Sequence, residues 1–412
     1  MTADEQPQPT GPIPRSQIPT QPTASQLRAI NEISRILNRS NPDLKTIDIL
    51  LNRAVGGNIA CLEPLRAALT KPNLPASTRL PIFLKALPLA ETAIQRVYGT
   101  TYRQNPAIHG HFWRLTESQG YIRLLLELVT VANDAKDYKV ALSTAQTILE
   151  ANHGDNNGIR DRIPLFLLHL NRPLEALNFC LSWLDTAHDG YDSLRYCPKG
   201  GFGDLKRYKK TDFDPTKPLQ TAKVQNLGHA SLIFSAALSA YRVFGDCTLS
   251  KSWLREAHNA NSHVIPILVL PSSDWPKKTN QNPRGLGSEP EARDYVFFAG
   301  DLWEGEPRQW VVDVAKEVER RECARRECRK VEPEKGRYKM CGGCHATWYC
   351  GQECQVADWK LGGHKRRCKE EKNIREITAS LSRRVWGLRS SVGSSLRVIA
   401  CAAERMWTAK LD

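Results

Sequence analysis

The chain has 412 residues, which suggests two or three domains, and its apolar fraction of 41% suffices for a buried core. Its formal net charge of +14 bears on solubility and non-specific association and selects no specific partner. No apolar run approaches the roughly 20 residues of a transmembrane segment, and residues 1–26 lack the apolar core of a signal peptide. We therefore expect an intracellular protein of the nucleus or cytoplasm, where a cysteine cluster indicates metal binding rather than disulfides.

Residues 1–26 are rich in Pro, Gln, Thr and Ser. Such a segment cannot bury enough apolar surface to offset the entropy lost on ordering, so we predict a disordered tail. Its prolines favour an extended polyproline conformation. The tail is therefore either an inert leader or a ligand for a domain of another protein.

Residues 27–318 are predicted to form a helical domain, because apolar residues recur at three- and four-residue spacing from Leu27 onward. The expected helices cover residues 27–37, 43–54, 59–69, 82–98, 121–136, 138–151, 159–170, 174–186, 230–244, 248–260, 291–304 and 310–319. A proline-punctuated connection is expected over residues 69–81.

The clearest internal repeat lies in the middle of this domain. The segment KVAL at residues 139–142 matches LEAL at residues 174–177 with a spacing of 35 residues. This period is close to the 34 residues of tetratricopeptide helix pairs, and alanine at these positions lets two helices approach closely. Residues 120–265 thus resemble degenerate tetratricopeptide repeats. The expected fold class is mostly α, with a helical-repeat scaffold.

A long polar and basic loop, residues 187–222, interrupts the repeats, and a second loop follows at residues 271–290. The glycine-rich PKGGFGD in the first loop lacks the Lys-Ser/Thr end of a P-loop, so we expect no phosphate site there. The aromatic residues that follow are expected to pack in the core; they are Tyr295, Phe297, Phe298 and Trp303.

Residues 371–412 are predicted to form a basic amphipathic helix, with an apolar stripe that includes Leu381, Leu388 and Leu396. Docking against this protein's own repeats is the simplest role for the stripe. Binding in a groove of a partner and lying on an anionic membrane are the alternatives.

Seven of the twelve cysteines fall between residues 323 and 368. With one histidine they form four pairs, enough for two tetrahedral zinc ions, and the candidate ligands are Cys323, Cys328, Cys341, Cys344, Cys350, Cys354, His364 and Cys368. Cys341 and Cys344 form a knuckle, while the last two pairs have the spacing of about one helical turn. If all eight bind, the net charge of the chain falls to about +11.

Residues 319–370 resemble the MYND zinc finger. The resemblance rests on the cysteine pairs together with Tyr349-Cys350, Cys354-Gln355, Trp359 and the His364/Cys368 pair. It implies interleaved ligands: Cys323, Cys328, Cys350 and Cys354 for one zinc, and Cys341, Cys344, His364 and Cys368 for the other. The chain departs from the family at its first pair, which has four intervening residues where the family usually has two. His345 is a possible substitute for Cys323 on chemical grounds.

Four protein ligands leave a zinc ion no open position, so both ions are expected to be structural rather than catalytic. The resemblance implies protein–protein interaction, often with short proline-rich peptides, and it carries Gln355 and Trp359 over as the peptide contacts. The alternative is that Trp359 only covers the zinc site. We therefore expect an adaptor with protein partners.

Two other classes of function are alternatives to the adaptor. A MYND-containing methyltransferase would need SET motifs, but Asn152-His153 is followed by Gly154-Asp155 in a helical context, and no other catalytic motif stands out. A transcription-associated protein with auxiliary nucleic-acid contacts is the other alternative. The finger is basic, through Arg325, Arg326, Arg329, Lys330, Lys365, Arg366 and Arg367. Interspersed acidic residues argue for weak, salt-sensitive contacts only.

Overall fold

The computed structural model describes residues 13–39, 41–70, 74–184, 207–218, 230–279, 285–318, 320–328, 330–334, 336–345, 347–369 and 372. The chain divides into two compact units, Met1–Ala315 and Lys316–Asp412. The first unit is helical, and the second holds the cysteine cluster. The predicted mostly α fold is confirmed.

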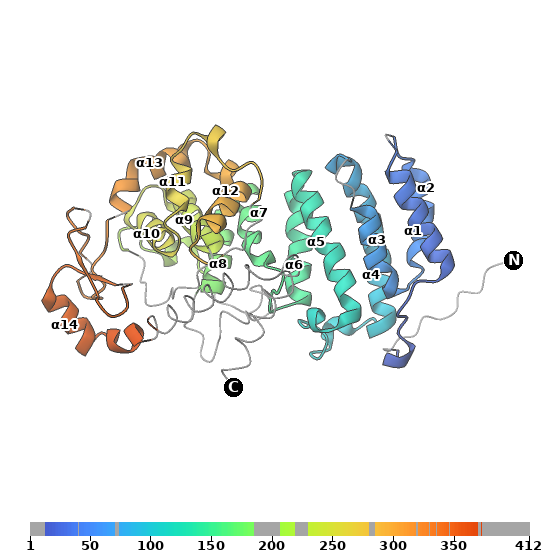
Figure 1. The fold of residues 1–412 in the computed structure, drawn as a ribbon, viewed down its shortest axis with the longest axis horizontal. Helices are drawn as coiled ribbons and strands as arrows, with labels where there is room; N and C mark the ends of the chain where they lie inside the picture. The colour runs from blue at the N-terminus through green and yellow to red at the C-terminus, as the bar shows by residue number, and fades with distance from the viewer. Residues whose placement is uncertain are drawn as a thin grey trace, which may run out of the picture. The chain divides into compact units, whose positions relative to one another are not determined.

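The first half of the first unit consists of helices that lie side by side (Figure 1). They are α1 (Ala24–Leu37), α2 (Leu44–Val55), α3 (Leu62–Leu69), α4 (Ala76–Tyr98), α5 (Gln119–Asp134) and α6 (Tyr138–Ala151). The 3-10 helices here are η1 (Arg15–Gln17), η2 (Ile59–Cys61), η3 (Tyr102–Gln104), η4 (Phe112–Arg114) and η5 (Thr116–Ser118). Each α-helix packs on the next, while α2 also contacts α4 and α3 contacts α5.

The second half of this unit continues the pairing, since α7 packs on α8, α8 on α9 and α9 on α10. Its α-helices are α7 (Ile163–His169), α8 (Pro173–Leu184), α9 (Ala230–Phe244), α10 (Thr248–Ala260), α11 (Val264–Leu268), α12 (Glu289–Trp303) and α13 (Glu306–Val318). The 3-10 helices are η6 (Ile159–Asp161), η8 (Lys210–Asp212) and η10 (Ser272–Asp274). Helix α12 returns to pack on α7 and α9.

Local sequence sets several helix ends. Thr23 and Gln26 form a capping box at the start of α1, and the Asp43 carboxylate accepts hydrogen bonds from the first backbone N–H groups of α2. Helix α2 stops at Gly56, whose φ of 52° lies in the left-handed region that glycine adopts without strain. Asp137 caps α6 in the same way as Asp43 caps α2.

The alanines at the repeat positions are buried between helices, as close helix packing requires. Ala141 of α6 and Ala176 of α8 are both fully buried, where a larger side chain would push neighbouring helices apart. The helix pairs α5–α6, α7–α8 and α9–α10 are present close to the predicted ranges. The tetratricopeptide character of these pairs stays a prediction.

Two predicted boundaries at the N-terminal end were wrong. Helix α1 begins at Ala24, within the predicted tail, and the Ile13 N–H of that tail donates to the Val97 carbonyl at 3.1 Å. Helix α4 begins at Ala76 rather than Ile82 and contains Pro81. Burial of apolar side chains along α4 outweighs the hydrogen bond that a proline removes.

Other sequence predictions have mixed outcomes. Tyr295 and Trp303 are buried as expected, with the Trp303 Nε1–H donating to the Tyr295 hydroxyl at 3.0 Å, but Phe297 is 37% exposed.

Within the predicted loop 187–222, residues 207–218 pack through Phe213, whose ring lies 5.4 Å from that of Phe244. The predicted helix over 371–412 lies outside the described residues, apart from residue 372. Among the described helices, none has the length and apolarity to cross a membrane.

Two carboxylates, the half-buried Glu91 and the buried Glu291, fasten helices together in this unit. Glu91 of α4 accepts hydrogen bonds from the hydroxyls of Tyr102 and Tyr121, each at 2.7 Å, and from Arg103 at 3.1 Å. Burial acts to raise the pKa of Glu91, but these donors outweigh it and hold the pKa below its ordinary value. Glu291 of α12 similarly accepts from Asn261 and from the Ala230 and Gly287 N–H groups.

We expect Tyr121→Phe to lower the free energy of unfolding by about 1–3 kcal/mol, because one oxygen of the charged, half-buried Glu91 carboxylate loses its donor. Urea denaturation followed by helical circular dichroism measures this change. The difference in the free energy of unfolding between Tyr121→Phe and the unsubstituted protein should decrease as the pH falls through the lowered pKa of Glu91, because the hydrogen bond favours the charged carboxylate.

Tyr138→Phe is the matched control, because the Tyr138 ring stacks on His169 at 3.9 Å and its hydroxyl makes no hydrogen bond with a described residue. We expect it to change the free energy of unfolding by less than about 0.5 kcal/mol. Equal effects of the two substitutions would contradict the role given to Glu91.

Candidate metal centres

The second unit brings the eight predicted ligands together in two clusters. The first holds Cys323, Cys328, Cys350 and Cys354, and the second holds Cys341, Cys344, His364 and Cys368. Within each cluster the four ligand atoms lie within 4.8 Å of one another. The ligand pairs alternate along the chain, so the expected interleaving is present.

The spacing of the ligand atoms fits tetrahedral zinc. Zn–S bonds of about 2.3 Å place two sulfurs of a tetrahedron about 3.8 Å apart. In the first cluster the Sγ of Cys350 lies 3.6 Å from that of Cys328 and 3.5 Å from that of Cys354. In the second, the Sγ atoms of Cys341 and Cys368 are 3.9 Å apart. Each cluster therefore suits one zinc ion, which when bound would cross-link four points of the chain.

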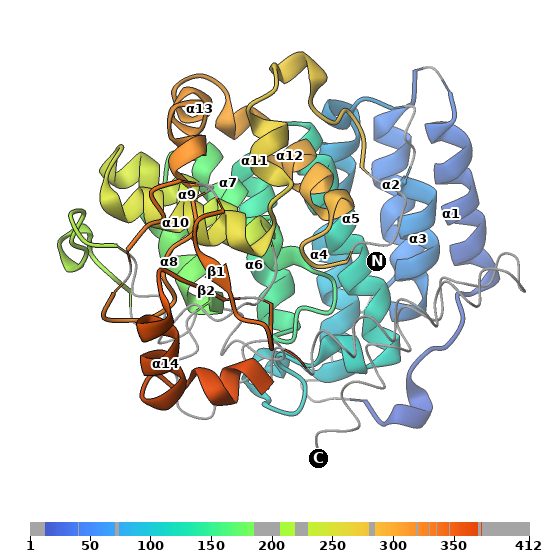
Figure 2. The same ribbon diagram turned by 60° about the vertical axis from the view of Figure 1, so that its left-hand side comes forward.

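Short elements position these ligands. Strands β1 (Lys339–Met340) and β2 (Trp348–Tyr349) pair antiparallel, with Lys339 opposite Tyr349 and Met340 opposite Trp348. Helix α14 (Gln352–Lys360) follows, and residues 364–369 are helical again (Figure 2). The knuckle cysteines follow β1, Cys354 lies on α14, and His364 and Cys368 lie on the last helical turn.

The four-residue gap of the first pair is absorbed by a turn. The Cys323 N–H donates to the Lys330 carbonyl at 2.8 Å, and Glu322 forms an isolated bridge with Val331. Between these contacts the chain turns back at Arg325, whose carbonyl accepts from the Cys328 N–H. Both sulfurs consequently reach the first cluster.

His345, the possible substitute for Cys323, belongs to neither cluster. It is exposed, and its φ of 52° places it in the left-handed region within the knuckle turn. Its side chain is therefore not needed as a ligand, because Cys323 fills the position.

Glu332 braces the turn of the first pair, and sequence reasoning gave it no role. Its buried carboxylate accepts from the backbone N–H groups of Arg321, Gly336 and Tyr338 at 3.0–3.3 Å. Burial acts to raise its pKa, but these donors hold it below the ordinary value. In the sequence, no periodic pattern separates this buried carboxylate from the exposed acidic residues around it.

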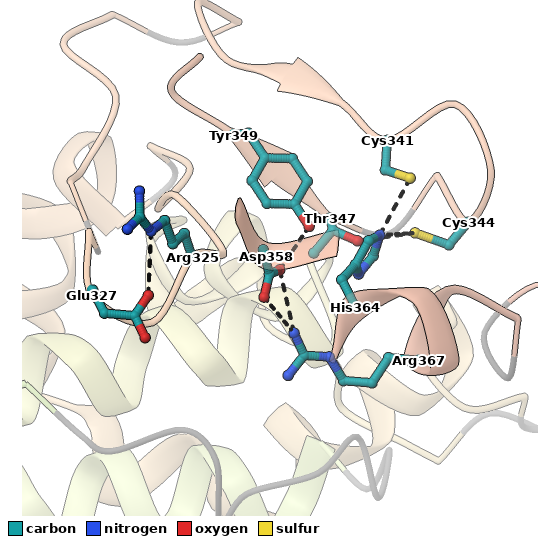
Figure 3. A network of polar contacts seen from close by, with 9 residues as sticks. All are labelled: Arg325, Glu327, Cys341, Cys344, Thr347, Tyr349, Asp358, His364 and Arg367. Carbon is teal, nitrogen blue, oxygen red and sulfur yellow. Dashed lines mark hydrogen bonds and ion pairs between the residues drawn. The ribbon is translucent and has the colours of Figure 1, made fainter. Parts of the chain in front are cut away.

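The second cluster is tightly enclosed. His364 directs its Nε2 at the sulfurs of Cys341 and Cys344, at 3.3 and 3.8 Å (Figure 3). A Cβ on Gly343 would lie 2.8 Å from the Cys368 sulfur, so the knuckle needs glycine there. Burial acts to raise the pKa of Cys341, but hydrogen bonds from His364 and backbone N–H groups lower it to about 6. This thiol is thus prepared to bind metal as a thiolate at neutral pH.

A polar network joins three elements beside the second cluster (Figure 3). The buried Asp358 of α14 accepts from the Tyr349 hydroxyl at 2.8 Å and from Arg367 Nη2 at 3.0 and 3.3 Å. Burial and the bond to Asp358 raise the pKa of Tyr349, which keeps its hydroxyl protonated as the donor. The network fixes β2, α14 and the helical turn that carries His364.

The two clusters differ in exposure. All four ligands of the second cluster are buried, whereas in the first Cys350 is exposed and Cys328 and Cys354 are half-buried. A chelator in solution therefore reaches the first cluster more readily.

The predicted peptide contacts both lie on α14. Gln355 is half-buried, and Trp359, one helical turn later, is 41% exposed. The Trp359 ring centroid lies 5.8 Å from that of His364, so the indole also covers one side of the second cluster. Val356 and Leu361 are exposed apolar neighbours, at 43% and 89%.

Residues 323–368 match the family model of the MYND finger. This segment is a MYND finger. The match begins and ends at the outermost predicted ligands, so it includes the first pair, Cys323 and Cys328. The MYND finger is a zinc-binding protein-interaction domain, and the two clusters fit its two zinc ions. No solved structure matches the chain.

We expect metal analysis to return two zinc ions per chain, and release to a colorimetric chelator to occur in two phases. The exposed first cluster should lose its ion faster than the buried second cluster. Cys354→Ser should remove the fast phase, and Cys344→Ser the slow one. A single rate for both ions would contradict this difference.

Asp358→Asn should weaken zinc binding at the second cluster by about tenfold, because its partners orient the helical turn that carries His364. Competition with a chelator of known affinity measures the change. Glu353→Gln makes the same chemical change at an exposed position of α14 and serves as the control. Similar losses in both variants would remove the special role of Asp358.

Proposed function

We propose that this protein is a non-enzymatic adaptor whose MYND finger binds short proline-rich peptides through Trp359 and Gln355. The observation that carries the proposal is the position of Trp359. Contact with His364 restrains one side of the indole, while 41% of the residue stays exposed. A restrained, exposed indole offers a flat apolar surface to a proline ring at little cost in entropy.

Gln355 complements the indole. Residues four apart on a helix share one face, so its amide lies on the same side of α14 as Trp359. An amide both donates and accepts, which suits the backbone of an extended peptide. Trp359 can both cover the zinc cluster and contact a peptide, because its packing over the cluster is what restrains the ring.

We propose that the protein has no enzymatic activity because the coordination of both zinc ions would be complete. Each cluster supplies four protein ligands, so neither zinc would have an open position for water or substrate. Seven cysteine ligands also suit a reducing compartment, which supports a location in the nucleus or cytoplasm. The helical unit would then present the finger and offer further surface for protein partners.

A proline-rich peptide library displayed against the full zinc-loaded chain tests the proposal. We expect enriched peptides whose affinity falls at least about tenfold in Trp359→Ala, and less in Gln355→Ala, where only hydrogen bonds are lost. Fluorescence anisotropy with the enriched peptides measures these changes.

Phe297→Ala, at a similarly exposed aromatic of α12, is the control and should leave affinity unchanged. Zinc content must remain at two per chain in each variant, and Trp359→Phe keeps an aromatic cover over His364 if the alanine variant loses metal. A library without enrichment, or enriched peptides indifferent to Trp359, would sink the peptide-binding role.

A further inference from the structure

The segment that carries Trp359 and His364 has an excess of positive charge. Within residues 352–369 the cationic side chains are Lys360, Lys365, Arg366, Arg367 and Lys369. The acidic ones are Glu353 and Asp358, and Asp358 is buried against Arg367. Lys360, Lys365 and Lys369 are exposed and make no ion pair with any residue that the structure describes. The charges of these three lysines are therefore available to a partner.

Arg367 contributes a cation that is held in place. Only its Nη2 is used by Asp358, while 48% of the side chain is exposed. Its remaining N–H groups make no hydrogen bond within the described residues. The Asp358 carboxylate, which also accepts from the Tyr349 hydroxyl, holds the guanidinium. Binding an anion there would therefore cost little side-chain entropy.

The lysines lie on the two elements that meet at Trp359. Lys360 follows the tryptophan directly, and Lys365 follows His364, whose ring contacts the indole. Lys369 is one helical turn beyond Lys365, on the same face. We call Lys360, Lys365, Arg367 and Lys369 the basic rim. With exposed Val356, Trp359 and Leu361, the surface combines apolar and cationic groups.

We propose that the partner of this finger is an acidic peptide, in which Asp or Glu residues beside the proline-rich segment contact the basic rim. This inference rests on the proposed peptide binding and adds the charge of the partner. Charge complementarity favours it: exposed cations lie on the helix that carries the indole and on the helical turn that carries His364, while the anion Asp358 is already paired with Arg367. The apolar residues beside the indole favour a peptide over a bare polyanion.

The test uses the full zinc-loaded chain and fluorescein-labelled peptides that share one enriched proline-rich centre. Their ends carry either two Glu residues, two Gln residues or two Lys residues. We expect the Glu peptide to bind about fivefold tighter than the Gln peptide, and the Lys peptide to bind weakest. The preference should narrow as NaCl is raised from about 50 to about 300 mM, because exposed charges are screened.

Lys365→Glu combined with Lys369→Glu should abolish or reverse this order. Lys45→Glu combined with Lys139→Glu makes the same change of net charge at exposed positions of α2 and α6 and should preserve it. Two zinc ions per chain in both double variants show that the finger remains folded.

Each other outcome overturns the inference in a distinct way. Equal binding of the Glu and Gln peptides removes the acidic partner and leaves peptide binding intact. Failure of every peptide removes the proposed function as well. If a labelled single-stranded DNA 12-mer binds the chain at physiological salt as tightly as the Glu peptide and loses binding in Lys365→Glu/Lys369→Glu, the rim is a nucleic-acid surface instead.

Discussion

Zinc–thiolate coordination is the interaction on which the finger depends. Among its described residues, the regular elements are two two-residue strands, α14 and a helical turn. Its buried apolar cluster consists largely of the ligand cysteines themselves with Tyr338 and Tyr349. A core of this size contributes little hydrophobic stabilisation. Metal binding must therefore supply most of the folding free energy. The position of Trp359 follows from this, because the indole packs against a metal ligand.

Hydrogen-bonded carboxylates, three of them buried and Glu91 half-buried, fasten the chain in both units. Glu91 and Glu291 join helices, Glu332 braces a turn and Asp358 joins a strand to two helical elements. A charge that is removed from water needs compensating donors, and each of these carboxylates accepts at least three hydrogen bonds. Such groups specify one arrangement of the chain, since a shift of any donor leaves the charge uncompensated.

The finger was predictable because its ligand spacing is short-range chemistry. The spacing within each cysteine pair predicts whether it lies on a turn or on one face of a helix. The interleaving of the pairs was predicted from the family resemblance. The helices were predictable where apolar periodicity is long, as in α5 and α6. Pro81 hid the first turn of α4, and five-residue α11 is too short to show a period. Glu332 and Arg367 could not be assigned because their roles depend on contacts that other segments create.

Because the ligands are interleaved, a break or an insertion in the chain has different consequences at different positions along the finger. A break between Cys328 and Cys341 would separate the ligands of the first ion only, and one between Cys354 and His364 those of the second only. The stretch from residue 345 to 349 is different, because both metal-closed loops pass through it. An insertion there would lengthen both loops at once. Tolerance to insertions should therefore be lowest in this five-residue stretch, which holds β2 and no ligand.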